Sequence, residues 1–364
     1  MLNNKTVAVV VPAYNEETQI GIVIDTMPDF VDRIIIVNDC SKDKTADIVK
    51  KYIENAKNED TIEIAPYNRE IKETFFNRAE IVELEMLKEE EKKFPAHMIY
   101  NNDVKNRIVL INNTKNARVG GAIAVGYKWC RDHAIDCTAV MAGDAQMDPS
   151  ELESICAPVI YENIDYVKGN RLSHKAATKM IPKKRHFGNS VLSALTKVAS
   201  GYWGISDTQT GYTAISLHAL KSINLFDIYR TYGCPNDILV KLNIAKCTLR
   251  EIPIKPVYAV GEQSKMKIGK VIPTVSWLLL KSFFKRITVK YFIVDFHPIF
   301  IFYSLAMLAG VCSFGFLIDI IYGLFTLGVT TGTYLGFVVL FMTSLLTTGF
   351  AMWLDIYDNE KLQK

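Results

Sequence analysis

One stretch of the sequence restricts the fold more than any other, because it carries almost no charge. Asp319 is the only charged residue between Phe296 and Leu354. Residues 298–318 and 334–354 are each 21 residues long and uncharged, and a membrane-spanning helix needs roughly 20 apolar residues. The sequence therefore predicts two transmembrane helices over residues 298–357. A buried hairpin of a soluble protein is the alternative.

Basic residues precede the first predicted span, which places that side of the membrane in the cytoplasm. They are Lys281, Lys285, Arg286 and Lys290. Residues 268–294 also contain aromatic residues and leucines, as expected for helices that lie on a membrane surface with lysines toward lipid phosphates. A buried connector helix is the alternative. We expect a multi-pass protein of the cell membrane whose N-terminal part faces the cytoplasm.

The N-terminal part alternates strand-like and helix-like segments. Apolar, β-branched runs predict buried strands at 6–11, 33–38, 107–112 and 138–142. Strands that alternate with helices predict an α/β fold, with a mostly parallel sheet flanked by helices and ligands at the carboxyl ends of its strands.

The sequence divides into three regions by composition. We expect an α/β domain over 1–260, membrane-interface helices over 261–297 and transmembrane helices over 298–357. Residues 55–106 break the α/β pattern with a charged, helix-prone segment. We interpret this segment as a surface insertion, and a partner-binding or regulatory arm is the alternative.

Polar segments follow three of the predicted strands. They are PAYNE (12–16), NDCSKDKT (38–45) and GDAQMDP (143–149). Because the carboxyl ends of parallel strands meet at one edge of a sheet, these segments should converge. Carboxylates there can bind a nucleobase or ribose, or a metal that neutralises a diphosphate.

The order of these segments resembles the family 2 inverting glycosyltransferases, within them the dolichyl-phosphate mannose synthase-like, polyprenyl-phosphate branch. PAYNE matches the opening motif of that family, and VNDCSKDKT resembles its VDDxSxDxT, with Asn38 replacing the first Asp. NARVGGAIAVG (116–126) resembles NxGxGGAxxxG, with Arg118 at the first Gly. The resemblance implies a glycosyltransferase A-type fold. It also implies a nucleotide-sugar site formed by Pro12, Tyr14, Glu16, Asn38, Asp39, Gly121, Asp144 and Ala145.

The metal motif departs from the family pattern. The family usually has DxDxQ, whereas residues 142–146 read AGDAQ, so Ala142 stands where the first carboxylate is expected. Asp144 and Gln146 remain as the implied ligands of Mg²⁺ or Mn²⁺, with diphosphate oxygens and water completing an octahedral shell. We expect weaker metal binding in the absence of nucleotide. A helix cap is the alternative role for Asp144.

Two arginine-containing segments resemble the acceptor-binding elements of the family. GNR (169–171) matches a GSR-like element, and RHFGN (185–189) resembles the stretch that grips a lipid phosphate. The planar fork of arginine suits a phosphate; ordinary surface basic residues are the alternative. By resemblance, the lipid-phosphate site comprises Arg171, Arg185, Asn189 and Lys265, the last of which could instead contact the donor diphosphate.

DTQTGY (207–212) resembles the D-x-Q-x-G-[FY] motif beside the reacting sugar. The resemblance assigns catalysis to Asp207 and Gln209, together with Asp144. A hydroxyl acceptor needs a general base, but a phosphate monoester, with a second pKa of about 6, is mostly dianionic at pH 7. We therefore expect Asp207 to act by position or charge. A purely structural Asp–Gln pair is the alternative.

The resemblance thus implies transfer of a sugar, with inversion, from a UDP- or GDP-linked donor to polyprenyl or dolichyl phosphate, for cell-envelope or protein glycosylation. The near balance of 42 Lys plus Arg against 39 Asp plus Glu argues against nucleic acid as a partner. Two spans are too few for a transport path, so moving the product across the membrane would need another protein or a homo-oligomer. Two alternatives remain: a transferase with a hydroxyl acceptor, and a non-catalytic nucleotide-sugar-binding membrane protein. The sequence leaves the sugar and the prenyl length open.

Overall fold

The centre of the molecule is a single twisted sheet. The computed structural model describes residues 1–56, 62–66, 74–101, 105–177, 183–257, 268–326 and 328–364. Within these residues, the strands form one sheet in the order β3-β4-β2-β1-β5-β7-β6-β8. The strands are β1 (Val7–Ala13), β2 (Arg33–Asn38), β3 (His97–Ile99), β4 (Ile108–Asn113), β5 (Cys137–Val140), β6 (Tyr166–Asn170), β7 (Thr213–Ser216) and β8 (Leu249–Pro253).

The strand directions bring the polar segments to one edge. Strands β4, β2, β1 and β5 are parallel neighbours. Strand β7 runs antiparallel between β5 and β6, so β6 and its parallel neighbour β8 again run in the direction of β5. The carboxyl ends of these strands and the amino end of β7 therefore lie at the same edge. The expectation of a mostly parallel sheet flanked by helices is confirmed.

Helices cover both faces of the sheet and bury its apolar side chains. Alternate residues of β1 enter different cores: Val10 belongs to the cluster that includes α4, α8 and α9, and Val9 to the cluster under α1, α2 and α5. Burial on both faces explains why these strands are uninterrupted apolar runs. The helices are α1 (Ile20–Asp25), α2 (Thr45–Asn55), α4 (Arg118–Asp132), α5 (Leu152–Glu162), α8 (Leu217–Ser222) and α9 (Cys234–Ile244), with short 3₁₀ turns η1 (Pro149–Glu151) and η2 (Leu225–Asp227).

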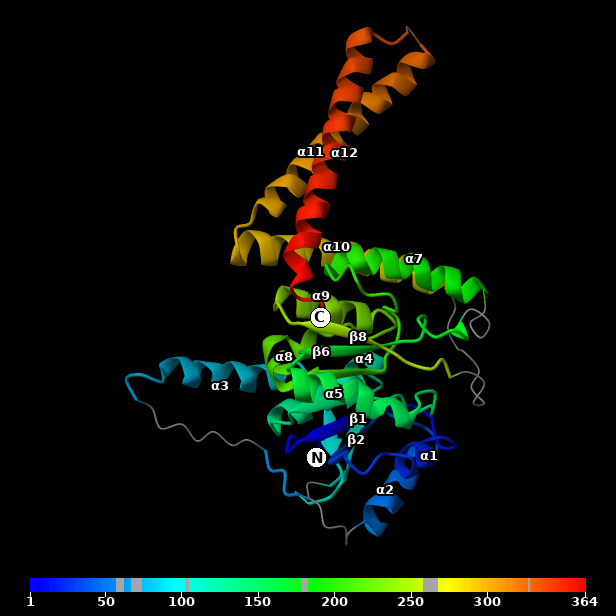
Figure 1. Ribbon diagram of the computed structural model, residues 1–364, viewed down its shortest axis with the longest axis vertical. Helices are drawn as coiled ribbons and strands as arrows, with labels where there is room; N and C mark the ends of the chain where they lie inside the picture. Colours follow the sequence, from blue (N-terminus) through cyan, green and yellow to red (C-terminus); the bar gives the residue numbers. More distant parts are fainter. Residues whose placement is uncertain (57–61, 67–73, 102–104, 178–182, 258–267, 327) are drawn as a thin grey trace.

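The segment between α2 and β4 is only partly peripheral. Helix α3 (Arg78–Glu91) has no buried residue and extends sideways from the body (Figure 1), as expected of a solvated insertion. However, Ile64 and Phe94 are buried in the main core, and β3 pairs with β4. The interpretation of 55–106 as a surface insertion is therefore wrong for these flanks, because they complete the sheet edge and its core.

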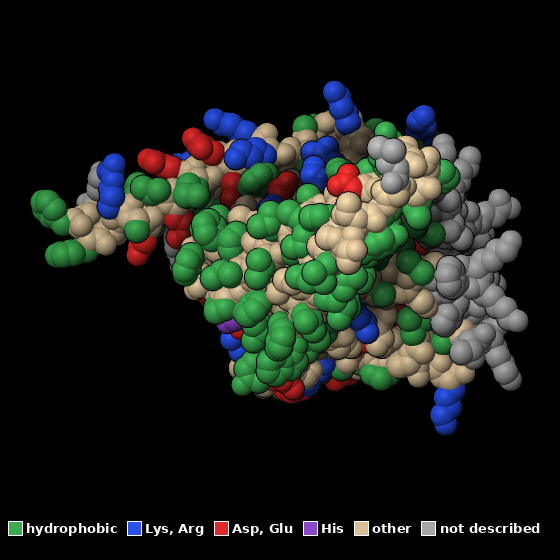
Figure 2. All heavy atoms as spheres, turned by 90° about the horizontal axis from the view of Figure 1, so that it is seen from above, with side chains coloured by type: hydrophobic (Ala, Val, Ile, Leu, Met, Phe, Trp, Pro, Cys, Tyr) green, Lys and Arg blue, Asp and Glu red, His purple; other side chains and the backbone are tan. Residues whose placement is uncertain are grey.

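Two long apolar helices project from the body. Helices α11 (Pro298–Leu324) and α12 (Thr331–Glu360) pack against each other, and each is long and apolar enough to cross a membrane. Only 17% of the most apolar window of α11 and 6% of that of α12 is buried, which argues against the hairpin of a soluble core. Figure 2, which looks onto this pair, shows hydrophobic side chains covering it.

Beneath the projecting pair, α7 (Lys183–Ser200) and α10 (Ile268–Thr288) lie side by side (Figure 1). A π-helical segment, η3 (Val289–Val294), leads from α10 to α11. Trp277, Leu280 and Phe284 of α10 are exposed. Lys290, one of the lysines expected to face lipid phosphates, is instead buried, and so is the neighbouring Arg286. For Lys290 the expectation is wrong, because both residues pair with acidic residues of α12.

The chain returns to the sheet after α12. Leu249 of β8 donates its N–H to Leu362 O at 2.7 Å and accepts a hydrogen bond from Lys364 N at 3.0 Å. The side chain of Leu362 is buried in the main core. Residues 362–364 thus form a short addition beside β8, and they tie the far end of α12 to the body.

Candidate active site

The loops after β1 and β2 form one unit. Asn15 N donates to Ser41 Oγ at 3.0 Å, and Lys42 N donates to Asn15 Oδ1 at 2.9 Å. Glu16 N donates to Thr45 Oγ1 at 2.9 Å. These bonds fix the backbone of the PAYNE segment against the start of α2, so Pro12, Tyr14 and Glu16 lie beside the second predicted nucleotide segment, as the sequence predicts.

Asn38 and Asp39 are held by their neighbours on β4. Asn38 Nδ2 donates to Asn112 Oδ1 at 2.8 Å, directly across the parallel register. Asp39 Oδ1 accepts from Asn113 Nδ2 at 2.8 Å and from Ala117 N at 2.7 Å, at the start of α4. An Asp at position 38 could only accept, so Asn112 would have to present its amide group. The substitution at the family motif is thus accommodated locally.

The glycine-rich segment serves packing at several positions. A Cβ on Gly121 would lie 2.6 Å from Cβ of Ala117, and one on Gly126 would lie 2.3 Å from Cγ1 of Val10. Gly121 is buried inside this packing, and its contact with a nucleotide sugar stays a prediction. Arg118 has φ +65°, a left-handed conformation that favours glycine, which explains why the family motif has Gly there.

The predicted metal ligands line a small pocket at the end of β5. Asp144, Gln146 and Arg171 share it with Asp148 and Lys255. Its volume of about 70 Å³ has room for an ion with a few waters. Asp144 Oδ1 accepts from Gln146 N at 3.1 Å. Burial raises the pKa of the Asp144 carboxyl, an effect that a bound cation would offset.

The donor set of this pocket fits a hard divalent cation. Asp144 and Asp148 offer carboxylate oxygens and Gln146 a carboxamide oxygen, which are the ligand types that Mg²⁺ and Mn²⁺ prefer. Asp148 also caps η1 by accepting from Ser150 N at 2.9 Å, and it lies 3.4 Å from Lys255 Nζ. Ala142 offers no carboxylate, but Asp148, four residues after Asp144, brings a second carboxylate into the same pocket.

Arg171, which lines the pocket, belongs to an ion pair that the sequence did not reveal. Arg171, at the end of β6, donates from Nε to Asp207 Oδ2 at 2.8 Å and from Nη2 to Oδ1 at 3.1 Å. Asp207 is 1% exposed. Burial alone would raise its pKa, but the hydrogen bonds and charge of Arg171 hold that pKa below its usual range. Arg171, predicted to bind the acceptor phosphate, therefore grips Asp207 in this structure.

Gln209 is held next to this pair by two contacts. Its Nε2 donates to Thr208 Oγ1 at 2.8 Å and to Asn236 Oδ1 of α9 at 3.2 Å. Asn236 is buried, and its own Nδ2 has no hydrogen-bond partner within the described residues. The structure therefore brings Asp144, Gln146, Asp207 and Gln209 to one edge of the sheet.

Two charged residues under this edge were missed by the sequence reasoning. Lys168 is fully buried in β6, and its ammonium group donates to Thr210 O; burial lowers its pKa to about 8. Glu251 of β8 accepts from Asp207 N at 3.0 Å and from Asn170 Nδ2 at 2.8 Å. A lysine inside an apolar strand (YVKGN) was the available signal for Lys168.

The remaining predicted acceptor residues are only partly placed. Arg185 and Asn189 lie on the first turns of α7, but their side chains are outside the described residues. Lys265 also lies outside the described residues. Their contacts with a lipid phosphate stay predictions.

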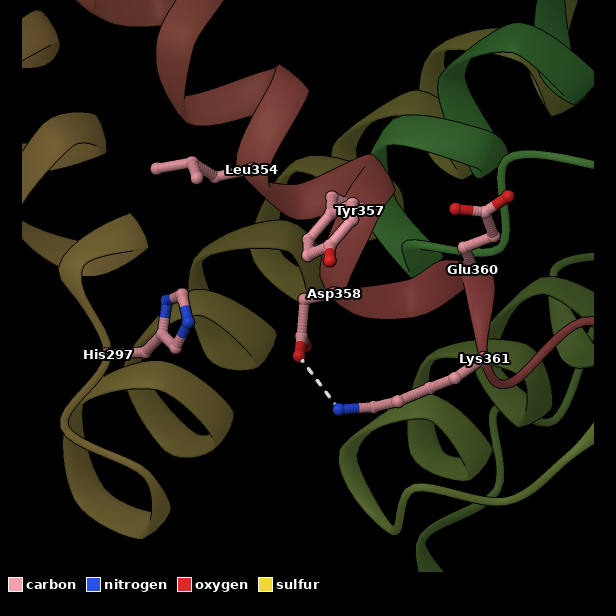
Figure 3. Close-up of a pocket in the computed structure, with 6 residues that line it drawn as sticks. All are labelled: His297, Leu354, Tyr357, Asp358, Glu360 and Lys361. Carbon is pink, nitrogen blue, oxygen red and sulfur yellow. Dashed lines mark hydrogen bonds and ion pairs between the residues drawn. The ribbon is translucent and has the colours of Figure 1, made fainter.

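Two other features could be mistaken for the site. A pocket of about 660 Å³ lies between His297 and the last turns of α12 (Figure 3), but it is lined by none of the predicted site residues. Asp165, His218 and Cys247 bring potential metal-ligating atoms within 4.8 Å of one another, at the opposite edge of the sheet. Asp165 already accepts from His218 and Thr248, and burial raises the pKa of the Cys247 thiol to about 12. This cluster is therefore a poor metal site.

Comparison with known proteins finds a matching family profile and several related sequences. The profile of glycosyl transferase family 2 matches residues 8–69, which contain the first two site loops. The UDP-N-acetylglucosamine–dolichyl-phosphate N-acetylglucosaminyltransferase of Methanococcus voltae is 27% identical over 256 residues, covering 70% of this chain and 87% of that protein. A dolichyl-phosphate beta-glucosyltransferase of Trichomonas vaginalis is 24% identical over 295 residues, covering 77% and 74%.

Among solved structures, glucosyl-3-phosphoglycerate synthase of Mycobacterium tuberculosis aligns with 78% of this chain and 81% of its own. The TM-score is 0.46 and the identity 15%. The family profile and the related sequences show that the chain is similar to glycosyl transferase family 2 and to relatives named as dolichyl-phosphate sugar transferases.

Proposed function

We propose that this protein transfers a sugar from a nucleotide-sugar donor to polyprenyl or dolichyl phosphate, with inversion at the anomeric carbon. An oxygen of the acceptor phosphate forms the new bond to C1, the C1–O bond to the nucleoside diphosphate breaks, and the nucleoside diphosphate leaves. The proposal is carried by one observation: the Asp144 pocket and the Arg171–Asp207 pair lie at one sheet edge with the nucleotide loops. The related dolichyl-phosphate transferases support it.

The state of Asp207 favours a phosphate acceptor over a hydroxyl. A general base works best with a pKa near the operating pH. Burial would raise the pKa of Asp207, but Arg171 holds it below its usual range, and both carboxylate oxygens accept hydrogen bonds from Arg171. Such a carboxylate is a weak base, which a dianionic phosphate does not need. Asp207 instead orients Arg171 at the rim of the pocket.

We assign Asp144 and Gln146 to a divalent cation, with Asp148 as a third oxygen donor in the pocket. When bound, the cation would supply charge that stabilises the leaving diphosphate. The residues of the chain do the rest: the loops after β1 and β2 hold the nucleoside, and Lys255 lines the pocket as a second positive charge.

We further propose that residues 1–260 act in the cytoplasm, that 261–297 lie at the membrane interface and that 298–357 span the bilayer. Exposed Trp277 and Phe284 on α10 fit a helix in contact with lipid, because aromatic side chains favour the membrane–water interface. The exposed lysines Lys281 and Lys285 on the same helix can reach lipid phosphates.

The test uses the full chain in nanodiscs with Mn²⁺, polyprenyl phosphate and a panel of UDP- and GDP-sugars. Mass spectrometry should detect one glycosylated lipid phosphate, and Asp144→Asn should lose the product while the surface variant Asp132→Asn retains it. Binding of nucleotide without any transfer would favour a non-catalytic protein. Transfer to a lipid hydroxyl, and not to the phosphate, would favour the alternative acceptor class.

A further inference from the structure

A network of buried polar side chains joins the helix pair α11–α12 to the body, and we call it the membrane junction. Its centre is Arg286 of α10, which is 0% exposed and donates from Nη1 and Nη2 to the two oxygens of Asp355 on α12, at 2.7 and 2.8 Å. The same guanidinium donates from Nε to Ala199 O at 2.9 Å and from Nη2 to Val198 O at 3.0 Å. One side chain therefore holds the end of α7 and the end of α12 together.

A second layer of the junction reaches α9 of the body. Lys290 Nζ donates to Asn359 Oδ1 at 2.6 Å and to Asn243 Oδ1 at 3.1 Å. Asn243 Nδ2 also donates to Asn359 Oδ1 at 2.7 Å, and Tyr291 Oη donates to Asp355 Oδ1 at 2.7 Å. The described side chains of this network belong to α9, α10, η3 and α12.

The junction is connected to the catalytic motif through α7. Ser193 Oγ and Thr208 Oγ1 are both buried and share a hydrogen bond of 3.0 Å, and Thr208 also accepts from Gln209. Ser193 precedes Ala199 by six residues, about 9 Å along the helix axis. A continuous set of packed groups therefore runs from Asp355 on the second apolar helix to the motif that contains Asp207.

A buried ion pair at this position is not needed for stability alone. Burying two charges costs much of what their attraction returns, and well-packed apolar residues of similar size often serve stability equally well or better. The planar guanidinium group of Arg286 adds directional hydrogen bonds, which fix Asp355 and the α7 carbonyls in one geometry. The neighbouring carbonyls of Val198 and Ala199 also favour a positive charge at the end of α7.

We propose that the Arg286–Asp355 pair positions the body against the helix pair and thereby sets the height of the active site at the bilayer surface. The proposal rests on the proposed function for its catalytic consequence. The first turns of α7 lie about 21 Å from Ala199, so rocking the body by about 10° around the junction would move them by about 4 Å. Displacements of about 1 Å can cost a hundredfold in rate.

The decisive variant is the double substitution Arg286→Met with Asp355→Leu, which removes the charges and keeps the volume. We expect it to fold with a modestly lower thermal stability, because the two charges no longer have to be buried, but the carbonyls of Val198 and Ala199 and the hydroxyl of Tyr291 each lose a hydrogen-bond partner. For polyprenyl phosphate in nanodiscs, kcat/KM should fall about tenfold or more. For a short, water-soluble isoprenyl phosphate, kcat/KM and the donor KM should stay unchanged, because that acceptor reaches the site from solution.

A matched control lies next to the junction, since Lys246 follows α9 and Asp295 follows η3. Lys246 and Asp295 form an ion pair at 2.6 Å that is 48% and 29% exposed. The double substitution Lys246→Met with Asp295→Leu should leave both acceptors unaffected, since exposed pairs contribute little. Equal losses for both acceptors in the Arg286 variant, or full activity with the embedded acceptor, would overturn the proposal.

A distance measurement tests the proposal without an activity assay. Tyr161 on α5 and Leu346 on α12 are both exposed and can each be changed to Cys and spin-labelled. The distance between the two labels reports how the body lies relative to the helix pair. The exposed Cys40 and Cys312 are first replaced by Ser. A narrow distance distribution should broaden in the Arg286→Met, Asp355→Leu variant, and an unchanged distribution would refute the positioning role. Failure of the native chain to glycosylate either acceptor would instead count against the proposed function.

Discussion

Replacing Asp207 by Asn tests the central ion pair of the site. The substituted side chain would present an amide group in place of one carboxylate oxygen, so two donors would face each other at the Arg171 fork. Removing one partner of a buried pair costs about 3–5 kcal/mol. Arg171 is 21% exposed and can recover some hydration, so we expect the lower end, about 3 kcal/mol.

This loss can be measured as a shift in the thermal midpoint in detergent micelles. At about 2–4 °C per kcal/mol for a domain of 150–250 residues, Asp207→Asn should lower the Tm by about 6–12 °C. Asp132, which pairs with Lys128 at 2.8 Å and is 35% exposed, is a matched control, and Asp132→Asn should lower it by less than about 4 °C. Equal shifts for both variants would refute the reasoning.

The pH dependence gives a second reading of the same pair. Burial would raise the pKa of Asp207, yet Arg171 holds it below the usual value of 3.8. A carboxyl whose pKa is lower in the folded state stabilises the fold above its unfolded pKa, and this contribution is lost as the pH falls through the folded pKa. The native protein should therefore lose this increment below about pH 4, and the Asn variant should not.

Other predictions concern the metal, the acceptor and the insertion. Asp144→Ala should abolish Mn²⁺-dependent transfer, and normal rates with Mn²⁺ would contradict the metal assignment. Because burial raises the pKa of Asp144, Mn²⁺ binding, followed by calorimetry, should weaken on acidification at a higher pH than expected for an exposed Asp. Arg185→Ala should raise the KM for the lipid phosphate far more than that for the donor; an unchanged acceptor KM would remove it from that role. Replacing 78–91 by a short Gly-Ser linker should change kcat by less than about twofold, whereas an inactive but folded deletion would show that α3 takes part in function.

The sequence predicted the sheet well because its strands are buried on both faces. The runs at 33–38 and 138–142 were recognised since nothing polar interrupts them, and the structure has β2 and β5 there. The edge strand β3 was missed, because three residues within a charged segment carry too little periodicity to stand out. A tertiary contact, the pairing with β4, decides its conformation.

The sequence predicted which strand ends carry the candidate site, but not which of its side chains bond to each other. Motif order led to Asp144, Arg171 and Asp207, yet nothing in the sequence indicates that Arg171 and Asp207 grip each other across 36 positions. Glu251 was missed for the same reason, since its role comes from strand order. Lys290 was expected to face lipid because hydropathy cannot tell a buried cation from an exposed one.

The short addition of residues 362–364 beside β8 can form only after α11 and α12 have been synthesised. Residues 362–364 are made after both apolar helices, yet Leu362 fills the main core of the body and Lys364 bonds to Leu249. Until those residues leave the ribosome, the edge of β8 is open and the core lacks one side chain. Completion of the body therefore waits for α11 and α12, because Leu362 and Lys364 follow both helices in the chain.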